Sequence, residues 1–504
     1  MKINSICILG GGTAGFAVSS ILSRYRQISG SKFDIKLVYS KKIGSIGVGE
    51  STVRNVNEFF NYLDLNDRQW MKKCDATYKA ALKFTDFNKG SYFYYPFGDI
   101  PTDKNRYDVL SKWFIGKEFC PEICTSENAA TFFIPHTILA EKNKLTDSWF
   151  NLKENTAYHF DASKLGSLLE KYSKKRGVEI IEDEFVGALH DEDGYITELS
   201  CKNGTYGADL FVDCSGFESL LLGQTMKEEF IPFSDNLINN KALVARIPYT
   251  DKEKQLKNYT DSVALKNGWC WEIPLWNCMS VGYVHTNQFA TEEEIEQEFF
   301  DRYGEVEYKT IEYKTGRYER GWVKNVVGVG LAYGFIEPLE STGLATTFMN
   351  CFRLLEAISK RDRNCTQLDR DLFNNSVGDY GIDIWRAQVL MHYFLSIRDD
   401  TKYWKHITEK VNYRSNINSE FSYEQFLYRC GITRNLQPNP AEPGPMFITA
   451  GMEYSPFSRA MILSENLPEE YRNMDDFDEQ LEEMENIVKE LPSSYEFLRK
   501  NIYN

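Results

Sequence analysis

The sequence lacks any excess of basic charge. Its 504 residues include 73 Asp and Glu against 58 Lys and Arg, so the formal net charge is −15. An acidic chain with no basic run repels nucleic-acid backbones and anionic lipid headgroups, which argues against both as partners. A small anion could still bind at a local pocket lined by backbone N–H groups, because such a site does not depend on net charge.

We also expect no membrane span, no signal sequence and no zinc-type pairing of cysteine motifs. No apolar run is long enough to cross a bilayer, and the N-terminus leads directly into an expected strand. The eleven cysteines are scattered, Cys120 and Cys124 are the only close pair, and no second pair could complete a zinc site. We therefore expect reduced thiols, no metal and a cytoplasmic location, with zinc at this pair as the lesser alternative.

What the sequence does contain is a glycine-rich turn inside a β-α-β pattern. Residues 5–25 predict a strand, a tight turn and a helix, and residues 33–40 predict the next strand. Gly10, Gly12 and Gly15 allow the turn, and a pyrophosphate could sit at the helix N-terminus, beside Thr13 and Ala14. Such a turn can also close an ordinary strand-helix unit, but its place in a complete β-α-β pattern favours dinucleotide binding, with FAD preferred over NAD.

Later segments predict the rest of an α/β fold. Residues 209–214 and 326–329 are expected to be strands that return to the nucleotide sheet. Residues 225–320 are rich in aromatic and β-branched side chains, which is typical of a second, antiparallel sheet. After residue 340 the pattern becomes mainly helical.

These segments predict a two-part flavoprotein. Residues 1–350 are expected to form a Rossmann-type FAD-binding module of the kind found in flavin monooxygenases (GR2-like), with the antiparallel sheet inserted. Within it, about 85–155 and 225–320 would contribute to the substrate side. Residues 351–504 are expected to form a mainly helical substrate-binding cap.

Five motifs occur in the order of one enzyme family. They are GGGTAG at 10–15, GVGEST at 47–52, YHFDASKL at 158–165, GWCWEIP at 268–274 and GFIEPLESTGL at 334–344. In order and rough spacing they resemble the flavin-dependent tryptophan halogenases, and the last two blocks are much more specific than the glycine-rich turn. The resemblance extends from residue 3 to about residue 430 and implies a divergent member of this family.

The resemblance implies a reaction and its partners. Such an enzyme uses reduced FAD, oxygen and a halide (chloride, bromide or iodide) to form hypohalous acid, which halogenates an aromatic, indole- or phenol-like small molecule. A separate flavin reductase would supply the reduced FAD, because the chain has no second convincing nucleotide-binding unit. Tyr39 and Ser40 stand where an acidic residue commonly holds the ribose, so we expect modest flavin affinity. A homo-oligomer is left open.

By resemblance, Lys79 is the first catalytic residue. Its ammonium could polarise hypohalous acid through a hydrogen bond or form a haloamine, and the sequence leaves both open. The alternative is a solvated surface lysine, and Lys83, four residues later, would lie on the same face of a helix. Ala81 and Phe87 stand where the family usually has glycine and tryptophan, which affects the expected pocket shape more than the lysine.

Glu340 is the second catalytic residue by resemblance, as a carboxylate that accepts the proton lost from the halogenated arene. Glu337 would share a helical face with it, so helix capping is the alternative role. The halide is expected against backbone N–H groups at Thr342 and Gly343, where a glycine lets the backbone approach. A plain helix cap by Ser341 or Thr342 is the alternative there.

Two further segments are expected to contact the flavin. The first, resembling the segment that covers the flavin in the family, comprises Gly47, Val48, Gly49, Glu50 and Ser51. The second is the late flavin-binding turn with Gly330 and Phe335.

The substrate side is expected to be aromatic. Trp269, Trp271 and Ile273 alternate along a predicted strand, so they share one face and form a rigid apolar wall, with Cys270 and Glu272 on the other face. By resemblance this wall keeps the arene away from the flavin, where it would be hydroxylated. Ordinary packing is the alternative. Pro96 and Phe97, and Tyr403 and Trp404, are the other expected pocket residues, with core packing as the alternative for the last two.

Two rival functions remain at this point. A single-component FAD aromatic hydroxylase would need a late Gly-Asp motif, and this position reads GVGLAYGFIEP instead. An inactive flavin-binding scaffold would not need both Lys79 and Glu340. Beyond residue 430 no segment matches a tryptophan-recognising one, so the resemblance does not extend to free tryptophan as the substrate.

Overall fold

The computed structural model describes residues 1–504 except 43–46, 48, 100–105, 412–443, 456–458, 465–466 and 468. The chain divides into two compact units. The first comprises Met1–Ala76, Phe160–Leu237 and Tyr313–Arg386, and the second comprises Thr77–His159, Ile238–Glu312 and Ala387–Asn504. Among the described residues, no helix is both long and apolar enough to cross a membrane.

The first unit is built on a six-stranded sheet, with the order β20-β21-β12-β1-β2-β8. Its strands are β1 (Ser5–Leu9), β2 (Asp34–Tyr39), β8 (Glu179–Glu182), β12 (Leu210–Asp213), β20 (Trp322–Val323) and β21 (Val326–Gly328). All neighbours pair in parallel except β20 and β21. The expected β-α-β unit and both returning strands are therefore confirmed. The strands at the centre are almost wholly apolar because parallel sheets are buried on both faces.

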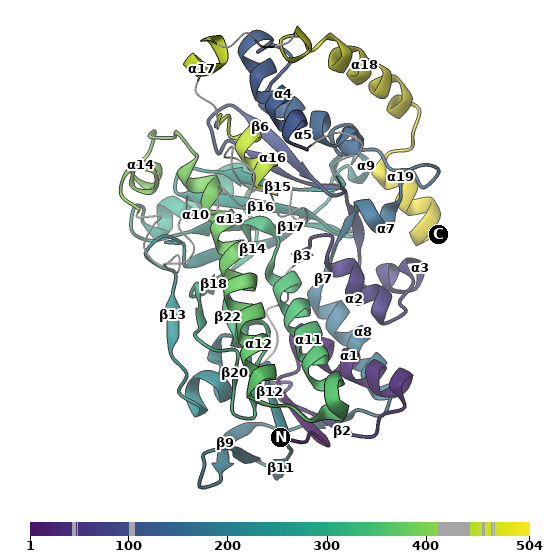
Figure 1. Cartoon of the computed structure of the whole chain (residues 1–504), viewed down its shortest axis with the longest axis vertical. Coiled ribbons are helices and arrows are strands. Elements are labelled where there is room, and N and C mark those ends of the chain that lie inside the picture. The colour runs from purple at the N-terminus through teal and green to yellow at the C-terminus, as the bar shows by residue number, and fades with distance from the viewer. Residues whose placement is uncertain are drawn as a thin grey trace. The chain divides into compact units, whose positions relative to one another are not determined.

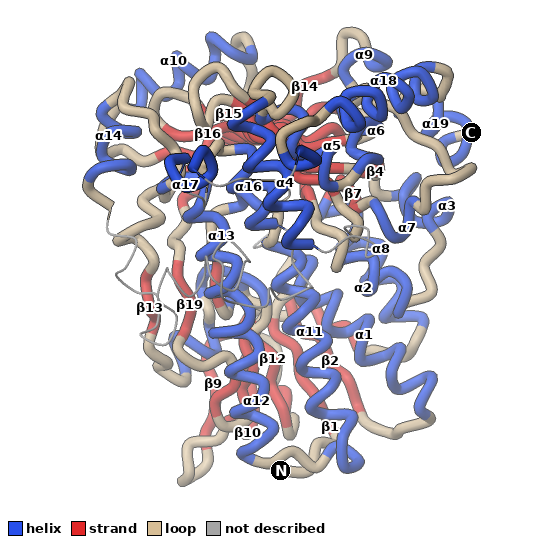
Figure 2. The backbone as a smooth tube through the Cα atoms, turned by 45° about the horizontal axis from the view of Figure 1, so that its top comes forward, coloured by secondary structure: helices blue, strands red, loops and turns tan. Residues whose placement is uncertain are grey.

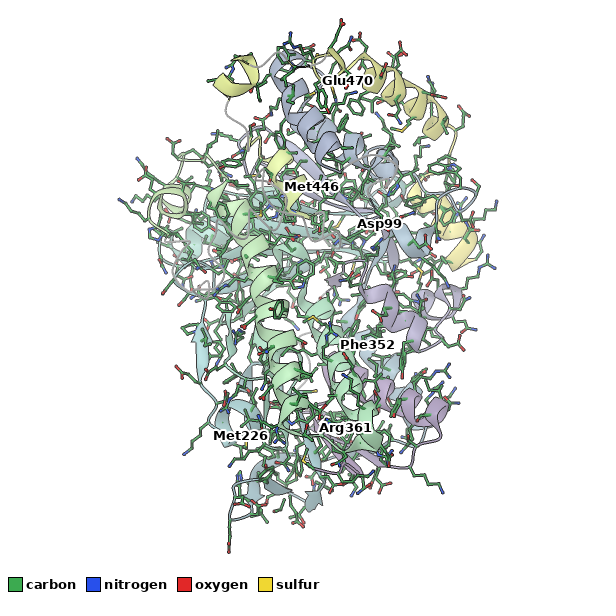
Figure 3. The ribbon with its side chains drawn as sticks, viewed as in Figure 1. Asp99, Met226, Phe352, Arg361, Met446 and Glu470 are labelled. Atoms are coloured by element: carbon green, nitrogen blue, oxygen red, sulfur yellow. The ribbon has the colours of Figure 1, made fainter. Side chains whose placement is uncertain are left out.

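Helices cover this sheet in Figure 2, which shows α1, α11 and α12 lying over the strands β1, β2 and β12. Helix α1 (Thr13–Ser29) packs against α8 (Ala162–Lys175) and α11 (Gly343–Ser359), and α11 packs against α12 (Gln367–Val377). Small side chains let α1 and α8 approach: Ser19 Oγ and Ser173 Oγ lie 2.8 Å apart. Phe352 of α11 contacts Tyr62 edge-on, at the end of α2 (Val56–Tyr62) (Figure 3).

Smaller elements complete the first unit. They are β3 (Gly49–Ser51), α3 (Asp67–Trp70), β9 (Phe185–His190), β10 (Ile196–Cys201), β11 (Thr205–Gly207), β13 (Phe230–Pro232), β19 (Gly316–Tyr318) and β22 (Gly334–Phe335). Strands β9, β10 and β11 form an antiparallel sheet. Its two turns fall at the Asp-Gly and Asn-Gly pairs, residues 193–194 and 203–204, which are pairs that favour tight hairpin turns.

The second unit contains a seven-stranded sheet, with the order β18-β14-β17-β16-β15-β5-β6. Its strands are β5 (Ala81–Thr85), β6 (Tyr92–Pro96), β14 (Lys241–Pro248), β15 (Tyr259–Ala264), β16 (Gly268–Pro274), β17 (Cys278–His285) and β18 (Tyr308–Glu312). Every pair is antiparallel except β15 and β5. The antiparallel sheet expected within residues 225–320 is confirmed, and two strands from residues 81–96 extend it.

Helices of the second unit come from both early and late parts of the chain (Figure 1). They include α4 (Arg106–Phe119), α5 (Ser126–Phe133), α6 (Ile138–Glu141), α7 (Leu152–Asn155), α9 (Lys252–Gln255), α10 (Glu292–Tyr303), all but the first turn of α13 (Asp383–Phe394), α14 (Lys402–Glu409), α16 (Gly444–Gly451), α17 (Arg459–Ser464), α18 (Asp475–Lys489) and α19 (Ser494–Leu498). Met446 of α16 is buried in a core with Trp113 of α4 and Phe133 of α5 (Figure 3). For the residues after 340 that the structure describes, the mainly helical pattern is confirmed.

One local prediction is wrong. Lys79 and Lys83 do not share a helical face, because Lys79 ends strand β4 (Thr77–Lys79) and Lys83 lies in β5. Strand β4 pairs with β7 (Ala157–Asp161), whereas β5 pairs with β15 and β6. Pairing with strands far along the chain outweighs the local preference, as is common for short segments. The two lysines therefore belong to different sheets.

Candidate functional site

The glycine-rich turn after β1 packs tightly at two glycines and is open at the third. Gly10 has φ +121°, and a Cβ there would lie 2.2 Å from the carbonyl oxygen of Cys214. A Cβ on Gly15 would lie 1.9 Å from the carbonyl oxygen of Gly10. A Cβ on Gly12, by contrast, would meet nothing within 4 Å. Gly10 and Gly15 close the turn onto the helix, and Gly12 leaves its backbone accessible at the start of α1, where N–H groups lack intrahelical partners.

Other predicted cofactor residues lie beside this turn. Gly330 has φ +67°, and a Cβ there would lie 3.1 Å from Cβ of Ala14, so the late turn packs against the start of α1. Thr13 Oγ1 donates a hydrogen bond to the carbonyl oxygen of Ala162 at 3.2 Å. Phe335 lies edge-on to Phe217, with ring centroids 5.5 Å apart. Thus Thr13, Ala14 and Gly330 are brought together.

Tyr39, at the end of β2, occupies the place of an acidic ribose ligand. Its ring lies edge-on to Phe16, with centroids 5.8 Å apart, and a Cβ on Gly11 would lie 2.3 Å from it. Burial raises the pKa of the Tyr39 phenol, and the neighbouring Glu170 carboxylate adds to the effect. Tyr39 is therefore a packing side chain that keeps its hydroxyl protonated.

The segment expected to cover the flavin is described only in part, because Val48 lies outside the described residues. Gly49, Glu50 and Ser51 form the short strand β3. Burial raises the pKa of the Glu50 carboxyl to about 7. Ser51 Oγ lies 2.9 Å from Ser341 Oγ, so this segment is joined to the turn before α11.

The turn before α11 contains Glu337, Glu340 and Thr342, and all three side chains are fully buried. Residues Pro338–Glu340 form one 3-10 turn, Ser341 is left-handed at φ +58°, and α11 begins at Gly343. Thr342 is the N-cap residue, yet its side chain makes no capping hydrogen bond. Among the described residues, Thr342 Oγ1 has no hydrogen-bond partner, although it is buried. Thr342 therefore does not cap α11 through its side chain.

Open space adjoins the same turn. A Cβ on Gly343 would meet nothing within 4 Å. A buried hydroxyl without a partner is costly unless a ligand or water satisfies it. Because the first N–H groups of a 17-residue helix and its dipole also favour negative charge, the residues present fit an anion at this point.

Lys79 is fully buried, which excludes the solvated surface lysine considered above. Its Nζ lies 5.4 Å from the ring centroid of Phe97, a predicted pocket residue that follows Pro96 at the end of β6. Lys83 differs: its Nζ lies 3.8 Å from Asp261 Oδ2 and 4.2 Å from the ring centroid of Tyr92. Lys79 therefore faces an aromatic ring, while Lys83 has a carboxylate partner.

The tryptophan strand alternates as predicted. Trp269 and Trp271 of β16 are buried, with ring centroids 6.2 Å apart, and Ile273 is buried too. On the other face, Cys270 joins the core cluster of Phe299, and Glu272 accepts a 2.6 Å hydrogen bond from Arg302 Nη2. Trp271 Nε1 is buried without a hydrogen-bond partner among the described residues.

Tyr403 and Trp404 of α14 are fully buried with their polar groups satisfied inside the protein. The Tyr403 hydroxyl lies 3.1 Å from Nδ2 of Asn239, and Trp404 Nε1 donates to the carbonyl oxygen of Leu265 at 2.7 Å. This is the arrangement that the core-packing alternative describes.

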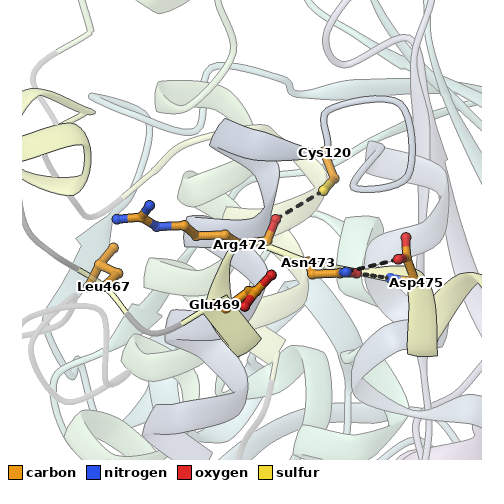
Figure 4. Close-up of a pocket in the computed structure, with 6 residues that line it drawn as sticks. All are labelled: Cys120, Leu467, Glu469, Arg472, Asn473 and Asp475. Carbon is orange, nitrogen blue, oxygen red and sulfur yellow. Dashed lines mark hydrogen bonds between the residues drawn. The ribbon is translucent and has the colours of Figure 1, made fainter.

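A cavity of about 500 Å³ occurs elsewhere in the second unit (Figure 4). It is lined by Cys120, Leu467, Glu469, Arg472, Asn473 and Asp475. Cys120 Sγ donates to the carbonyl oxygen of Arg472 at 3.3 Å, and neither Cys120 nor Cys124 is in a disulfide. None of the predicted site residues lines this cavity.

The parallel sheet and the glycine turn at the start of α1 define an α/β protein of the dinucleotide-binding kind. Residues 5–429 match the family described as tryptophan halogenase, and the chain belongs to this family. It is thus a flavin-dependent halogenase that acts on an aromatic substrate. This agrees with the resemblance drawn from the five motifs.

Individual relatives cover most of the chain. Tryptophan 6-halogenase ThaL of Streptomyces albogriseolus is 33% identical over 459 residues, covering 86% of this chain and 83% of ThaL. The apo structure of VirX1 is 38% identical with a TM-score of 0.91 over 100% of both chains. The structure of Tar14, a tryptophan C-6 flavin-dependent halogenase (chlorinase), is 28% identical with a TM-score of 0.82, covering 98% of this chain and 99% of Tar14.

Proposed function

We propose that this halogenase uses reduced FAD, received from a separate reductase, and a halide ion to halogenate an indole- or phenol-like small molecule, with Lys79 as the residue that activates the halogenating species. The observation that carries the proposal is the complete burial of Lys79 against Phe97. Burying an ammonium is costly and is rarely retained without a use. A cytoplasmic location and a homo-oligomer stay predictions.

The flavin would be held by the cradle at the start of α1. Gly12 supplies open backbone for the pyrophosphate, and Thr13, Ala14 and Gly330 surround it. When bound, reduced FAD would supply the electrons that activate oxygen. Tyr39 offers no carboxylate for the ribose, which supports modest affinity and fits a flavin that is exchanged with a reductase.

The halide would be held at the start of α11. The Thr342 hydroxyl would donate to the anion, and the open side of Gly343 would let backbone N–H groups approach it. Both features are properties of one turn and need no additional charged residue. Chloride, bromide and iodide would all fit this chemistry, and larger anions lose their hydration more easily.

Two residues would handle charge and protons. The Lys79 ammonium would donate a hydrogen bond to the oxygen of hypohalous acid, or react with it to form a haloamine, and so deliver an electrophilic halogen. The Glu340 carboxylate would accept the proton that the arene loses when its carbon-halogen bond has formed. Burial strengthens both interactions because water does not screen them.

The test is mass spectrometry of products from a panel of indoles, phenols and anilines. Each reaction contains FAD, a flavin reductase, NADH, catalase and one halide. We expect halogen-shifted products from the wild type and none from Lys79→Met, with FAD binding retained. Lys83→Met is the matched control, because Lys83 has Asp261 as its partner, and it should keep activity within about threefold.

Other outcomes would contradict the proposal. Oxygen-shifted products formed without halide would favour the hydroxylase. Retained halogenation by Lys79→Met would remove Lys79 from the chemistry. Bound flavin with no product from any arene and any halide would leave the inactive scaffold as the better account.

A further inference from the structure

Three buried side chains of the second unit form a hydrogen-bonded chain near Lys79. Thr77 Oγ1 donates to the carbonyl oxygen of Pro274 at 2.7 Å and lies 2.9 Å from His159 Nδ1. His159 Nε2 lies 2.9 Å from Thr260 Oγ1. Thr77 and His159 are fully buried and Thr260 is 2% exposed. These hydrogen bonds connect β4, β7 and β15 to the end of the tryptophan strand β16.

The donors in this chain fix the tautomer of His159. A carbonyl oxygen only accepts, so the single hydroxyl hydrogen of Thr77 goes to Pro274. In its contact with His159, the Thr77 hydroxyl can therefore only accept a hydrogen bond. Nδ1 of His159 must then carry a hydrogen and donate it to Thr77. In a neutral ring, Nε2 then accepts from the Thr260 hydroxyl. Burial, and next the charge of Lys79, lower the pKa of His159 well below its ordinary value, so the ring is neutral.

The strand register brings Lys79 to the same face. In the antiparallel pair β4 and β7, Thr77 lies opposite His159 and Lys79 lies opposite Ala157. Residues two apart on a strand share a face, so Thr77, Lys79 and His159 project to one side. The small Ala157 leaves room for the long lysine side chain. Lys79 is also the charged residue that acts on His159.

We propose that His159 is a positioning residue for Lys79. As a neutral Nδ1–H tautomer it anchors Thr77, and so holds the Lys79 strand against the end of the tryptophan strand without adding a second positive charge to that face. The motif YHFDASKL contains this histidine, yet the sequence gives it no role, because the hydrogen bonds that fix its tautomer come from residues 82 and 101 positions away. The inference rests on the proposed role of Lys79.

Two substitutions test the roles of the two ring nitrogens of His159 separately. In His159→Asn the amide nitrogen can take the place of Nδ1 and keep the bond to Thr77. In His159→Gln the amide oxygen can take the place of Nε2 and keep only the bond from Thr260. We expect kcat within about threefold of wild type for His159→Asn and about tenfold lower for His159→Gln, with KM for arene and halide unchanged in both.

Thr260→Val is a second, nearly isosteric test that leaves the bond between His159 and Thr77 intact. We expect its kcat to stay within about threefold of wild type. A tenfold fall in Thr260→Val, equal kcat values for the two His159 variants, or a loss confined to KM would overturn the proposal. Melting temperatures of all variants are measured so that a packing defect is recognised.

The tautomer itself is measured by ¹⁵N NMR of the histidine-labelled wild type, with His159→Asn used to assign the signal. We expect a protonated Nδ1 and an unprotonated Nε2. An imidazolium, or a protonated Nε2, would overturn the proposal. This measurement does not depend on activity: if Lys79→Met kept its halogenation, the proposed function of Lys79 would fail while the tautomer assignment could still hold.

Discussion

Trp271 lies across Gly282 on the neighbouring strand. The two residues are direct partners in the antiparallel pair β16 and β17. A Cβ on Gly282 would lie 2.0 Å from Cζ2 of Trp271, closer than any non-bonded carbon pair allows. The indole can therefore lie against the sheet only because its partner has no side chain. The conformation of the tryptophan wall depends on a glycine that no motif in the sequence identified.

Gly282→Ala is expected to displace the Trp271 indole. The required shift should lower the free energy of unfolding by about 1–3 kcal/mol, as overpacking does. In a Trp271→Leu background the same substitution should cost less, because the clashing ring is gone. Denaturant unfolding of the two single variants and the double variant gives the coupling energy between residues 271 and 282. Gly187→Ala is the control, since a Cβ there would meet nothing within 4 Å. If Gly282→Ala lowered the free energy of unfolding equally in the wild-type and Trp271→Leu backgrounds, the result would contradict the contact.

Gly12→Ala and Gly15→Ala are expected to fail in different ways. Ala is compatible with the backbone of Gly12 (φ −81°, ψ −174°) and with the space around it, so Gly12→Ala should fold with an unchanged melting temperature. It should bind FAD at least about tenfold more weakly, because the pyrophosphate would lose its close approach to the backbone. Gly15→Ala should not fold, since its Cβ would meet a carbonyl oxygen.

Flavin fluorescence titration and thermal unfolding without flavin measure the two effects for these glycine variants. Unchanged FAD affinity in a well-folded Gly12→Ala protein would remove the pyrophosphate from this turn.

Thr342→Val is expected to weaken halide binding without harming the fold. The Thr342 hydroxyl has no hydrogen-bond partner among the described residues, so its removal should leave the melting temperature unchanged or raise it. A lost hydrogen bond to an anion should raise KM for halide by about 10- to 100-fold. Steady-state halogenation at varied bromide and chloride measures the effect.

Thr346→Val is the matched control for the halide site. The Thr346 hydroxyl is already used within the helix, where it is within hydrogen-bonding distance of the carbonyl oxygens of Thr342 and Gly343 at 3.1 and 3.0 Å. Its loss should leave KM for halide unchanged. If both threonine variants raised KM equally, a general distortion of α11 would explain the result better than a halide ligand.

The Glu50 carboxyl should make the flavin-free protein less stable as pH rises. Its pKa is raised from 4.5 to about 7 by burial, so the unfolded chain loses this proton first. The free energy of unfolding is unaffected by this group below about pH 4.5 and should fall between about pH 4.5 and 7. Glu50→Gln should remove this fall, a relative gain on the order of 1–3 kcal/mol at pH 8.

Denaturant unfolding from pH 5 to 8 provides the test of Glu50. Glu58→Gln is the control, because Glu58 is exposed. If the free energies of unfolding of Glu50→Gln and the wild type differed by a constant amount across this pH range, burial would not be what keeps Glu50 protonated.

Local rules were sufficient for the glycine turn and for the tryptophan strand. A Cβ on Gly15 would meet the carbonyl oxygen of Gly10 within the same turn, so the spacing of these two glycines already states the geometry. The alternation of Trp269, Cys270 and Trp271 follows from the twofold period of any strand. In both cases the determining contacts, or the period itself, lie within a few residues.

Local rules failed at Lys79, because its conformation is set by a partner strand 78 positions away, where it pairs with Ala157. The same limit applies to the Thr342 hydroxyl, which has no hydrogen-bond partner among the described residues, and to the neutral ring of His159, since burial and donor geometry exist only once distant segments are packed together. The sequence by itself determined the fold class and the family, and it singled out the candidate site residues. Only the tertiary structure decided which of them are buried, charged or in contact, because these properties come from neighbours that are remote in the chain.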